Sequence, residues 1–392
     1  MQLTWSKIKL LIRKLFFHVI WLIPKRKRLI LFTAWFGEKY IDNTKYLYEY
    51  LLENTDYVVY WITKNQRVYQ NLKDMNYPVV LANTFKSLFL QIRAQVCFST
   101  VQFSDYKYWY LGNCIYIDLG HGNMIKDPGS ILYDKLSRNI HNYILKHIHY
   151  YAIVPSAYAK HYYKQIVELE DSNIIISDFA RNDVFIDSRL REEKNVFLDK
   201  YNNKRRIVYM PTHRSDGKVT LDLEKILPLK EIDDLCKKTN SVFIIKKHFY
   251  HRNEKLDLSV YDNIVDITNR EEIDPQVLLY QADILMTDYS SCFIDYLLLS
   301  RPIIFYQFDY DYYINQERSL FIDFEKENFA PVVKEKNKLI SIIHNSIENG
   351  INEYKGNLQR ITNMFFDNPK QTGGRKKDKD IMESLIKKYF NN

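Results

Sequence analysis

A histidine between two glycines follows an apolar, strand-like run of the chain. Gly120, His121 and Gly122 follow residues 114–118, with Leu119 between. Glycine lets a backbone turn sharply and approach another group, and open α/β sheets bind ligands at the carboxyl ends of their strands. An imidazole with a pKa near ~6.5 at such a turn is suited to general-base chemistry. Taken alone, the segment fits a flexible turn with an incidental histidine equally well.

Hydroxyl groups gather where a second predicted strand meets a helix. The segment TDYSS ends the strand-like run 283–287, opens the helical run CFIDYLLL, and contains Thr287, Asp288, Ser290 and Ser291. Hydroxyls beside the free N–H groups of a helix N-terminus favour diphosphate binding. Ordinary N-capping explains any one of these residues, whereas their combination at one junction favours a phosphate site.

Two further strand ends carry basic side chains. The segment PTHRSDG follows residues 206–210 and contains Arg214, whose guanidinium could clamp a phosphate through two N–H groups. Lys246 and His248 follow residues 241–245. A single cation at a strand end is usually structural or solvated, but four such strand ends in one chain predict a composite site.

The border between the two predicted halves of the chain carries further charges. Arg181 and Asp183 lie at this border, and Asp309 and Arg318 lie in a tyrosine-rich loop that could face it. We therefore count these four residues as candidates for the lining of an inter-domain cleft.

The sequence predicts no metal site and no cofactor. The D-x-D segment at 309–311 lies late in the chain rather than midway through a single nucleotide-binding domain, and the histidine pair at 147–149 lacks partner ligands. The four cysteines form no C-x-x-C pair, which indicates reduced thiols in a cytosol-like compartment and argues against structural zinc. Motifs of P-loop ATPases, ordinary dehydrogenases, zincins and α/β-hydrolases are missing as well.

Short apolar runs that alternate with helical stretches must position these residues. The strand-like runs are 29–34, 58–63, 78–82, 95–100, 114–118, 150–154, 173–177, 206–210, 241–246, 263–267, 283–287 and 302–307. Asp42 and Asn43 precede a helical period and predict its N-cap. Segment 368–380 reads as a loop before a last helix. Alternating strands and helices indicate parallel sheets, and therefore an α/β fold with two doubly wound domains.

The predicted organisation has five parts. They are a basic amphipathic segment (1–28), an N-terminal α/β domain (29–186), a charged linker (187–205), a C-terminal α/β domain (206–360), and a tail with a helix (361–392).

The net charge of +8 comes from the first of these parts. Residues 1–28 hold eight of the 56 Lys and Arg and no acid, so the remaining chain is balanced at 48 basic and 48 acidic residues. A nucleic-acid-binding protein would carry its basic residues over its folded surface. The longest uncharged stretch, 15–23, is far short of the ~20 residues that span a bilayer. We expect a helix on an anionic membrane surface; the alternative is a helix packed on the protein body.

In their order, these motifs resemble those of the CDP-glycerol glycerophosphotransferases, the family of teichoic-acid primases and polymerases. The resemblance covers about residues 30–335 and is carried by WFGEKYIDNTKYLYEYL, GHGNMIK, FARNDVF, PTHRSDG, IIKKH and ADILMTDYSSCFIDYLLLSRPIIFYQFDYDYY, followed by Arg318. Three positions depart from the family pattern: Gly120 and His213 each stand where a Trp is usual, and Phe249 replaces the Pro after His248.

The resemblance implies a GT-B architecture, in which two Rossmann-like domains face a cleft and the C-terminal domain binds the nucleotide donor. It implies transfer of a polyol phosphate from a CDP-activated donor to a hydroxyl, with release of CMP. The implied catalytic residues are His121 and His248. The implied donor and phosphate contacts are Arg214, Lys246, Thr287, Asp288, Ser290, Ser291 and Arg318. The implied acceptor-side or cleft residues are Gly120, Gly122, Lys126, Arg181, Asp183 and Asp309.

The implied acceptor is a lipid-linked glycan or growing polymer at the cytoplasmic face of the membrane, in teichoic acid or capsule-type synthesis, with no nucleic acid involved. A glycosyltransferase of the same fold that uses an NDP-sugar, an NDP-sugar epimerase and a membrane-bound scaffold are the alternatives. The motifs leave open whether the polyol is glycerol or ribitol, and whether one unit or many are added.

Overall fold

The chain forms two compact units. The computed structural model describes residues 5–101, 106–122, 125–126, 143, 147–166, 169–191, 199–251, 253–254, 256–369 and 373–390. Unit 1 comprises Met1–Asn123, Ser130–Asp183 and Gln371–Asn392, and unit 2 comprises Met124–Gly129 and Val184–Lys370.

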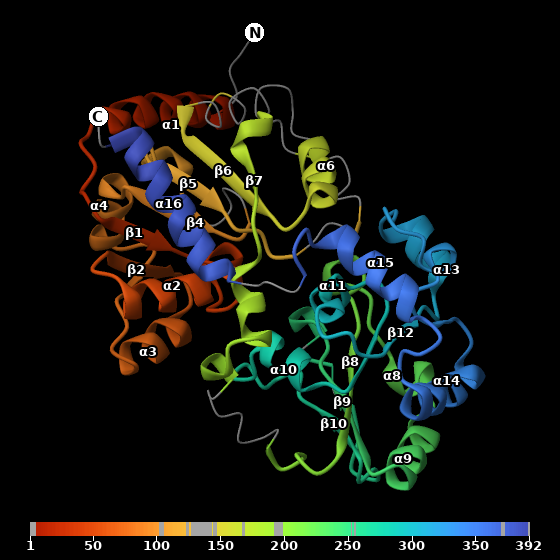
Figure 1. Cartoon of the computed structure of the whole chain (residues 1–392). Helices are drawn as coiled ribbons and strands as arrows, with labels where there is room; N and C mark the ends of the chain where they lie inside the picture. Colours follow the sequence, from red (N-terminus) through yellow and green to blue (C-terminus); the bar gives the residue numbers. More distant parts are fainter. Residues whose placement is uncertain are drawn as a thin grey trace. The chain divides into compact units, whose positions relative to one another are not determined.

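Unit 1 is built on a parallel sheet (Figure 1). Its described strands follow the order β3-β2-β1-β4-β5-β6-β7. Their bounds are β1 Leu29–Phe32, β2 Val58–Thr63, β3 Val79–Leu81, β4 Val96–Ser99, β5 Ile115–Asp118, β6 His149–Val154 and β7 Ile174–Ile176. All residues of β1, β4 and β5 are buried. This is expected where helices cover both faces of a parallel sheet.

The helices of unit 1 include one from each end of the chain. They are α1 Trp5–Trp21, α2 Asp42–Asn54, α3 Gln66–Asp74, α4 Phe85–Arg93, α6 Ala157–Ile166 and α16 Gly374–Phe390. Helix α1 packs closely on Gly112, where a Cβ atom would lie only 2.6 Å from the Trp21 backbone nitrogen. Glycine is therefore required at this position.

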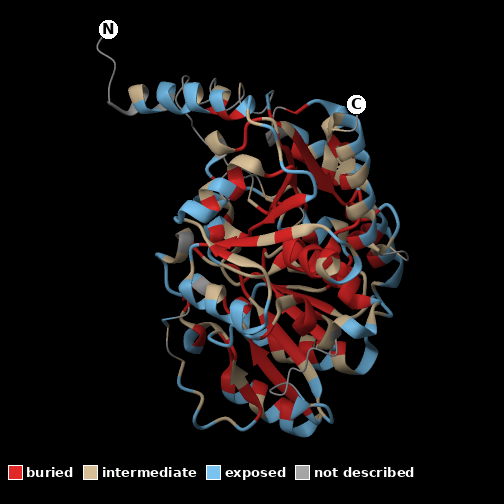
Figure 2. Ribbon diagram, turned by 90° about the vertical axis from the view of Figure 1, so that its left-hand side faces the viewer, coloured by how far each residue is buried: buried red, intermediate tan, exposed pale blue. Residues whose placement is uncertain are grey.

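Unit 2 is a second parallel sheet of order β10-β9-β8-β11-β12-β13 among the described residues. Its strands are β8 Arg205–Met210, β9 Ser241–Ile245, β10 Ile264–Asp266, β11 Ile284–Thr287, β12 Ile303–Tyr306 and β13 Val332–Val333. The helices around it are α8 Leu223–Ile226, α9 Leu229–Lys238, α10 Pro275–Gln281, α11 Cys292–Leu297, α12 Tyr310–Tyr312, α13 Phe324–Glu327, α14 Lys336–Asn349 and α15 Lys355–Phe365. The buried residues concentrate on the strands (Figure 2).

The sheets confirm the expected α/β class. Each of the twelve predicted strands is present, within one or two residues at either end, and β13 is an additional short edge strand. One local prediction was wrong: residues 374–380, expected to be a loop, form the first turns of α16. Asp183 accepts hydrogen bonds from the backbone N–H groups of Gly373, Gly374 and Arg375, which stabilises a helix start that the local composition does not suggest.

Within the described part of the chain, we find no helix that is both long enough and apolar enough to cross a bilayer.

Candidate active site

The predicted base, His121, lies in a turn after β5 in unit 1. Asp118, the last residue of β5, accepts a hydrogen bond from the backbone N–H of Gly120 (3.0 Å), and Gly120 has a φ of +62°. His121 is exposed, and its Nδ1 lies 2.8 Å from the Thr100 carbonyl oxygen. Because a carbonyl only accepts, Nδ1 carries the proton and the neutral ring presents an unprotonated Nε2. Nε2 has no hydrogen-bond partner among the described residues, as a general base requires.

Buried tyrosines support the carboxylate that holds this turn. The Oδ2 atom of Asp118 accepts hydrogen bonds from the Tyr150 hydroxyl (3.1 Å) and the Tyr163 hydroxyl (2.9 Å). Burial raises the pKa of Asp118 above its ordinary value, while the bonds from Gly120 and the tyrosines act in the opposite direction. No sequence motif marks Asp118, although its place at the end of β5 could have suggested a role.

Arg181 and Asp183, predicted to line a cleft, are instead buried inside unit 1. The Arg181 guanidinium pairs with Asp42 at 2.6 Å, and Asp183 binds the N-terminus of α16 as described above. Asp183 also pairs with the Arg375 side chain at 2.9 Å. Both residues join distant segments of the same unit.

Asp42 and Asn43 do not form the predicted N-cap of α2. The N-cap position is Ile41, and no side-chain hydrogen bond caps this helix. The side chains of Asp42 and Asn43 instead bind neighbouring loops of unit 1, and Asp42 Oδ1 also accepts from the adjacent Asn43 N–H (2.9 Å).

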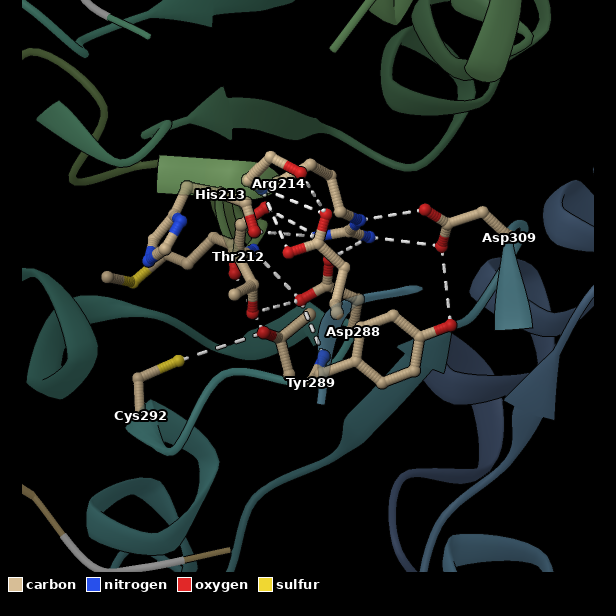
Figure 3. Close-up of polar contacts among 11 residues, drawn as sticks. Thr212, His213, Arg214, Asp288, Tyr289, Cys292 and Asp309 are labelled. Atoms are coloured by element: carbon tan, nitrogen blue, oxygen red, sulfur yellow. Dashed lines mark hydrogen bonds and ion pairs between the residues drawn. The ribbon is translucent and has the colours of Figure 1, made fainter. Parts of the chain in front are cut away.

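Arg214, predicted to clamp a phosphate, lies at the centre of a buried network in unit 2 (Figure 3). It donates to Asp309 through Nε (2.7 Å) and Nη2 (3.0 Å), to Asp288 through Nη2 (2.9 Å), and to the carbonyls of Thr212 and His213 through Nη1. A guanidinium has five N–H groups, and these contacts use all of them. In this arrangement Arg214 has no N–H left for a phosphate.

The TDYSS segment divides into a buried half and an accessible half. The Thr287 hydroxyl donates to the Met210 carbonyl (2.7 Å). Asp288 accepts from the Thr212 backbone (2.8 Å) and hydroxyl (2.7 Å), and both Thr287 and Asp288 are fully buried. Ser290 and Ser291 are partly exposed at the start of α11. Only these two serines remain open to a ligand.

Lys246 and His248 follow β9 as predicted, but in different surroundings. The Lys246 ammonium lies 3.4 Å from the Arg270 carbonyl, and burial lowers its pKa while nearby carboxylates, Asp274 first among them, oppose the shift. His248 accepts a bond from the Tyr250 N–H at Nδ1 (3.4 Å), so its neutral ring carries the proton on Nε2. His213 lies beside it, with ring centroids 4.6 Å apart. The two predicted catalytic histidines thus have opposite tautomers.

Lys126 lies in unit 2, although it follows the His121 turn by only five residues. It forms a bridge with Leu320, and the Phe321 N–H donates to the Ile125 carbonyl (2.8 Å). Burial lowers the pKa of Lys126 to about 8; Asp288 opposes this shift, and Arg318 and Arg214 add to it. Lys126 has no hydrogen-bond or ion-pair partner among the described residues. It therefore contributes a half-buried, unpaired cation beside the Arg214 network.

Arg318 is an exposed cation of unit 2. It directly follows Glu317, whose carboxylate accepts from the Ser215 backbone (2.9 Å) and hydroxyl (2.8 Å). These bonds tie the loop that carries Arg318 to the end of β8. The contact between Glu317 and Ser215 was not predicted, because no sequence pattern indicates that these two segments meet.

This chain is similar to proteins of one family over most of its length. The sequence matches the family described as "CDP-Glycerol:Poly(glycerophosphate) glycerophosphotransferase" over residues 15–373. It is 28% identical to a teichoic acid glycerol-phosphate transferase of Staphylococcus aureus, covering 88% of this chain and 92% of that protein. It is also 28% identical to a teichoic acid poly(glycerol phosphate) polymerase of Bacillus spizizenii, covering 84% and 86%. It spans 44% of the corresponding Bacillus subtilis polymerase.

Solved structures establish the fold class. A variant of the wall teichoic acid polymerase TagF soaked with CDPG superposes with a TM-score of 0.76 at 23% identity, covering 99% of both chains. A UDP-GlcNAc 2-epimerase from Neisseria meningitidis gives 0.56 at 12% identity, covering 93% of this chain and 100% of the other. The fold is therefore GT-B-like. The match over most of its length shows that this chain belongs to the CDP-glycerol:poly(glycerophosphate) glycerophosphotransferase family.

Proposed function

We propose that this protein transfers glycerol phosphate from CDP-glycerol to a hydroxyl of a lipid-linked acceptor or growing polymer, with release of CMP, in teichoic acid or capsule-type synthesis. The observation that carries the proposal is His121, an exposed base with a fixed tautomer in a chain that matches this family over residues 15–373. Glycerol is favoured over ribitol, because a ribitol-phosphate polymerase relative matches only 55% of this chain.

In the proposed reaction, unit 1 supplies the base and unit 2 holds the donor. His121 Nε2 takes the proton of the acceptor hydroxyl, whose oxygen forms a bond to the phosphorus that carries the glycerol. The bond from that phosphorus to the bridging oxygen breaks, and CMP leaves with the electron pair. Lys126 and Arg318 balance the diphosphate charge, Ser290 and Ser291 donate to its oxygens, and the His248 Nε2–H adds a further donor. Positioning and electrostatics provide most of the catalysis in such transfers.

The test is CMP release by the full chain with CDP-glycerol or CDP-ribitol, with and without a lipid-linked disaccharide, followed by mass spectrometry of the lipid product. Acceptor-dependent release with a gain of one or more glycerol phosphates is expected. Consumption of an NDP-sugar without CMP release would instead indicate a glycosyltransferase. A single addition would identify a primase, and a ladder of products would identify a polymerase.

The first helix supports a proposed attachment to an anionic membrane at the cytoplasmic face. One face of α1 packs on unit 1 through Phe17 and Ile20, which are buried. The other face bears a stripe of exposed apolar residues at helical spacing: Leu11, Ile12, Leu15, Phe16 and Val19. In Figure 2 the helix next to the N label is drawn largely as exposed. Lys9 and Arg13 are exposed on the same helix. An apolar stripe with nearby cations favours the interface of an anionic bilayer.

The double substitution Leu11→Glu/Leu15→Glu should lower partitioning onto anionic vesicles by at least about 100-fold, since two leucines together contribute about 3–6 kcal/mol when they leave water. Vesicle co-sedimentation measures the change. Val260→Glu, at a residue 77% exposed in unit 2, is the matched control and should leave binding unchanged. Equal binding of the double variant and the wild type would contradict the proposed attachment.

The lowered pKa of Lys126 predicts that kcat/KM for CDP-glycerol falls at alkaline pH, which gives its pH profile an alkaline limb. As the pH rises through about 8, its ammonium loses the proton, and the donor site loses a positive charge. The value of kcat/KM for CDP-glycerol should then fall by about tenfold between pH 7 and pH 9, as expected for the loss of one charge-assisted contact.

In Lys126→Arg the guanidinium stays protonated over this range, so the limb should disappear. Lys338→Arg, at an exposed position of α14, should retain it. An unchanged alkaline limb in Lys126→Arg would assign the titration to another group.

A further inference from the structure

Asn43 connects three backbone segments around the His121 turn. It is fully buried at the start of α2. Its Nδ2 donates to the carbonyl oxygens of Leu119 (2.8 Å) and Gly120 (3.1 Å), and its Oδ1 accepts from the Arg181 N–H (3.1 Å). One amide therefore holds the two peptide groups that precede His121 and links them to a segment far along the chain.

Asp42 extends the same connection to the loop after β1. Its Oδ1 accepts from the Arg181 guanidinium (2.6 Å), and its Oδ2 accepts from the Trp35 indole N–H (3.1 Å). The Trp35 ring lies against the His121 ring, with centroids 5.1 Å apart at 62°. The Trp35 backbone N–H donates to the Thr100 hydroxyl (3.1 Å), and the carbonyl of the same Thr100 accepts from His121. These contacts connect Asp42, Trp35 and Thr100 around the His121 imidazole.

The backbone at three residues near these contacts has an unfavourable conformation. Trp35, Phe36 and Asp42 have φ values of 48°, 62° and 74°, a region that non-glycine residues seldom occupy. Such residues persist only where the surrounding contacts fix them, and they cluster at functional sites. Here the three residues lie on the segment that carries the indole and the carboxylate to the His121 turn.

We propose that Asn43, with Asp42 and Trp35, is a positioning residue that fixes the ring orientation and tautomer of His121. This inference rests on the proposed function, in which His121 is the base. The hydrogen bond from His121 Nδ1 to Thr100 exists only while the turn at 119–121 keeps its place, and Asn43 is the side chain that binds both carbonyls ahead of it. Without this support, the imidazole gains access to the other tautomer, and its Nε2 is no longer reliably unprotonated.

Asn43→Asp is the sharpest variant. It conserves the shape and the acceptor for the Arg181 N–H, but it removes both donors to the 119–120 carbonyls. Turnover should fall by about 100-fold, as for a reacting group displaced by about 1 Å, while the Kd for CDP-glycerol in unit 2 stays within twofold. Trp35→Phe, at a partly exposed residue, tests the same set if Asn43→Asp does not fold; it retains a ring and removes the N–H to Asp42. Asn54→Asp, at the exposed end of α2, is the matched control.

Two readouts separate positioning from a general structural effect. In the double variant Asn43→Asp/His121→Ala, turnover should be no lower than in His121→Ala alone. If Asn43→Asp lowered turnover in the His121→Ala protein by the same factor as in the wild type, the inference would be overturned. In ¹⁵N-histidine NMR, with His121 assigned by its loss in His121→Ala, the wild type should show the Nδ1–H tautomer and Asn43→Asp (or Trp35→Phe) a shift towards Nε2–H.

An unchanged tautomer and unchanged turnover in the variants that fold would also overturn the inference. The NMR readout does not depend on the reaction. If His121→Ala turned over at the wild-type rate, the proposed base would be wrong, yet the spectra would still show whether Asn43 fixes the ring.

Discussion

His121→Gln is expected to lower kcat by about 10²- to 10⁴-fold while leaving the Kd for CDP-glycerol within twofold. The lower and upper limits are those typical of removing a general base. Donor affinity should persist, because His121 belongs to unit 1 and the cations assigned to the diphosphate, Lys126 and Arg318, belong to unit 2. Single-turnover CMP release and isothermal titration calorimetry measure the two quantities separately.

The control for this prediction is His161→Gln, which changes an exposed histidine on α6 of the same unit and should retain full turnover. A His121→Gln protein with wild-type kcat would show that the acceptor proton goes elsewhere. One with weakened donor binding and normal kcat would show that His121 contacts the donor instead.

The sequence predicted the strands that carry this site better than the contacts between its side chains. Buried parallel strands give long apolar runs, so all twelve predicted strands were found, and the predicted strand ends do carry Arg214, His121 and the TDYSS segment. A sequence pattern shows that a polar residue ends a strand, but it does not show which polar group the folded chain brings to meet it.

The pairing partners decide which of these residues are available to a ligand. Arg214 and Lys126 are both cations in family-like motifs. Arg214 meets Asp288 and Asp309 from segments 74 and 95 residues away, whereas Lys126 meets no carboxylate at bonding distance within the described part of the chain. The long separations of these contacts are not encoded in any local spacing. The same reason explains why Arg181 and Asp183 resembled cleft residues in the sequence and are buried links in the structure.

Arg214→Leu should destabilise unit 2 by about 3–5 kcal/mol, the usual cost of removing one partner of a buried ion pair. Leucine fills much of the same volume, but it leaves the carboxylate of Asp288, which is fully buried, without its cation, and that of Asp309 without two donors. Urea denaturation of the full chain, followed by fluorescence, should show an earlier transition for this unit. Adding Asp309→Asn in the same background should recover part of the loss, because it removes one of the two unpaired charges.

A comparison with a surface ion pair distinguishes this role from the phosphate contact that the motif first suggests. Arg360 pairs with Glu327 at 2.7 Å, but its side chain is 52% exposed, so Arg360→Leu should cost less than about 1 kcal/mol. If Arg214 instead held the donor, Arg214→Leu would be as stable as Arg360→Leu and would raise the KM for CDP-glycerol. Its five occupied N–H groups argue for the first outcome, because phosphate binding would require at least one bond to a buried carboxylate or carbonyl to break.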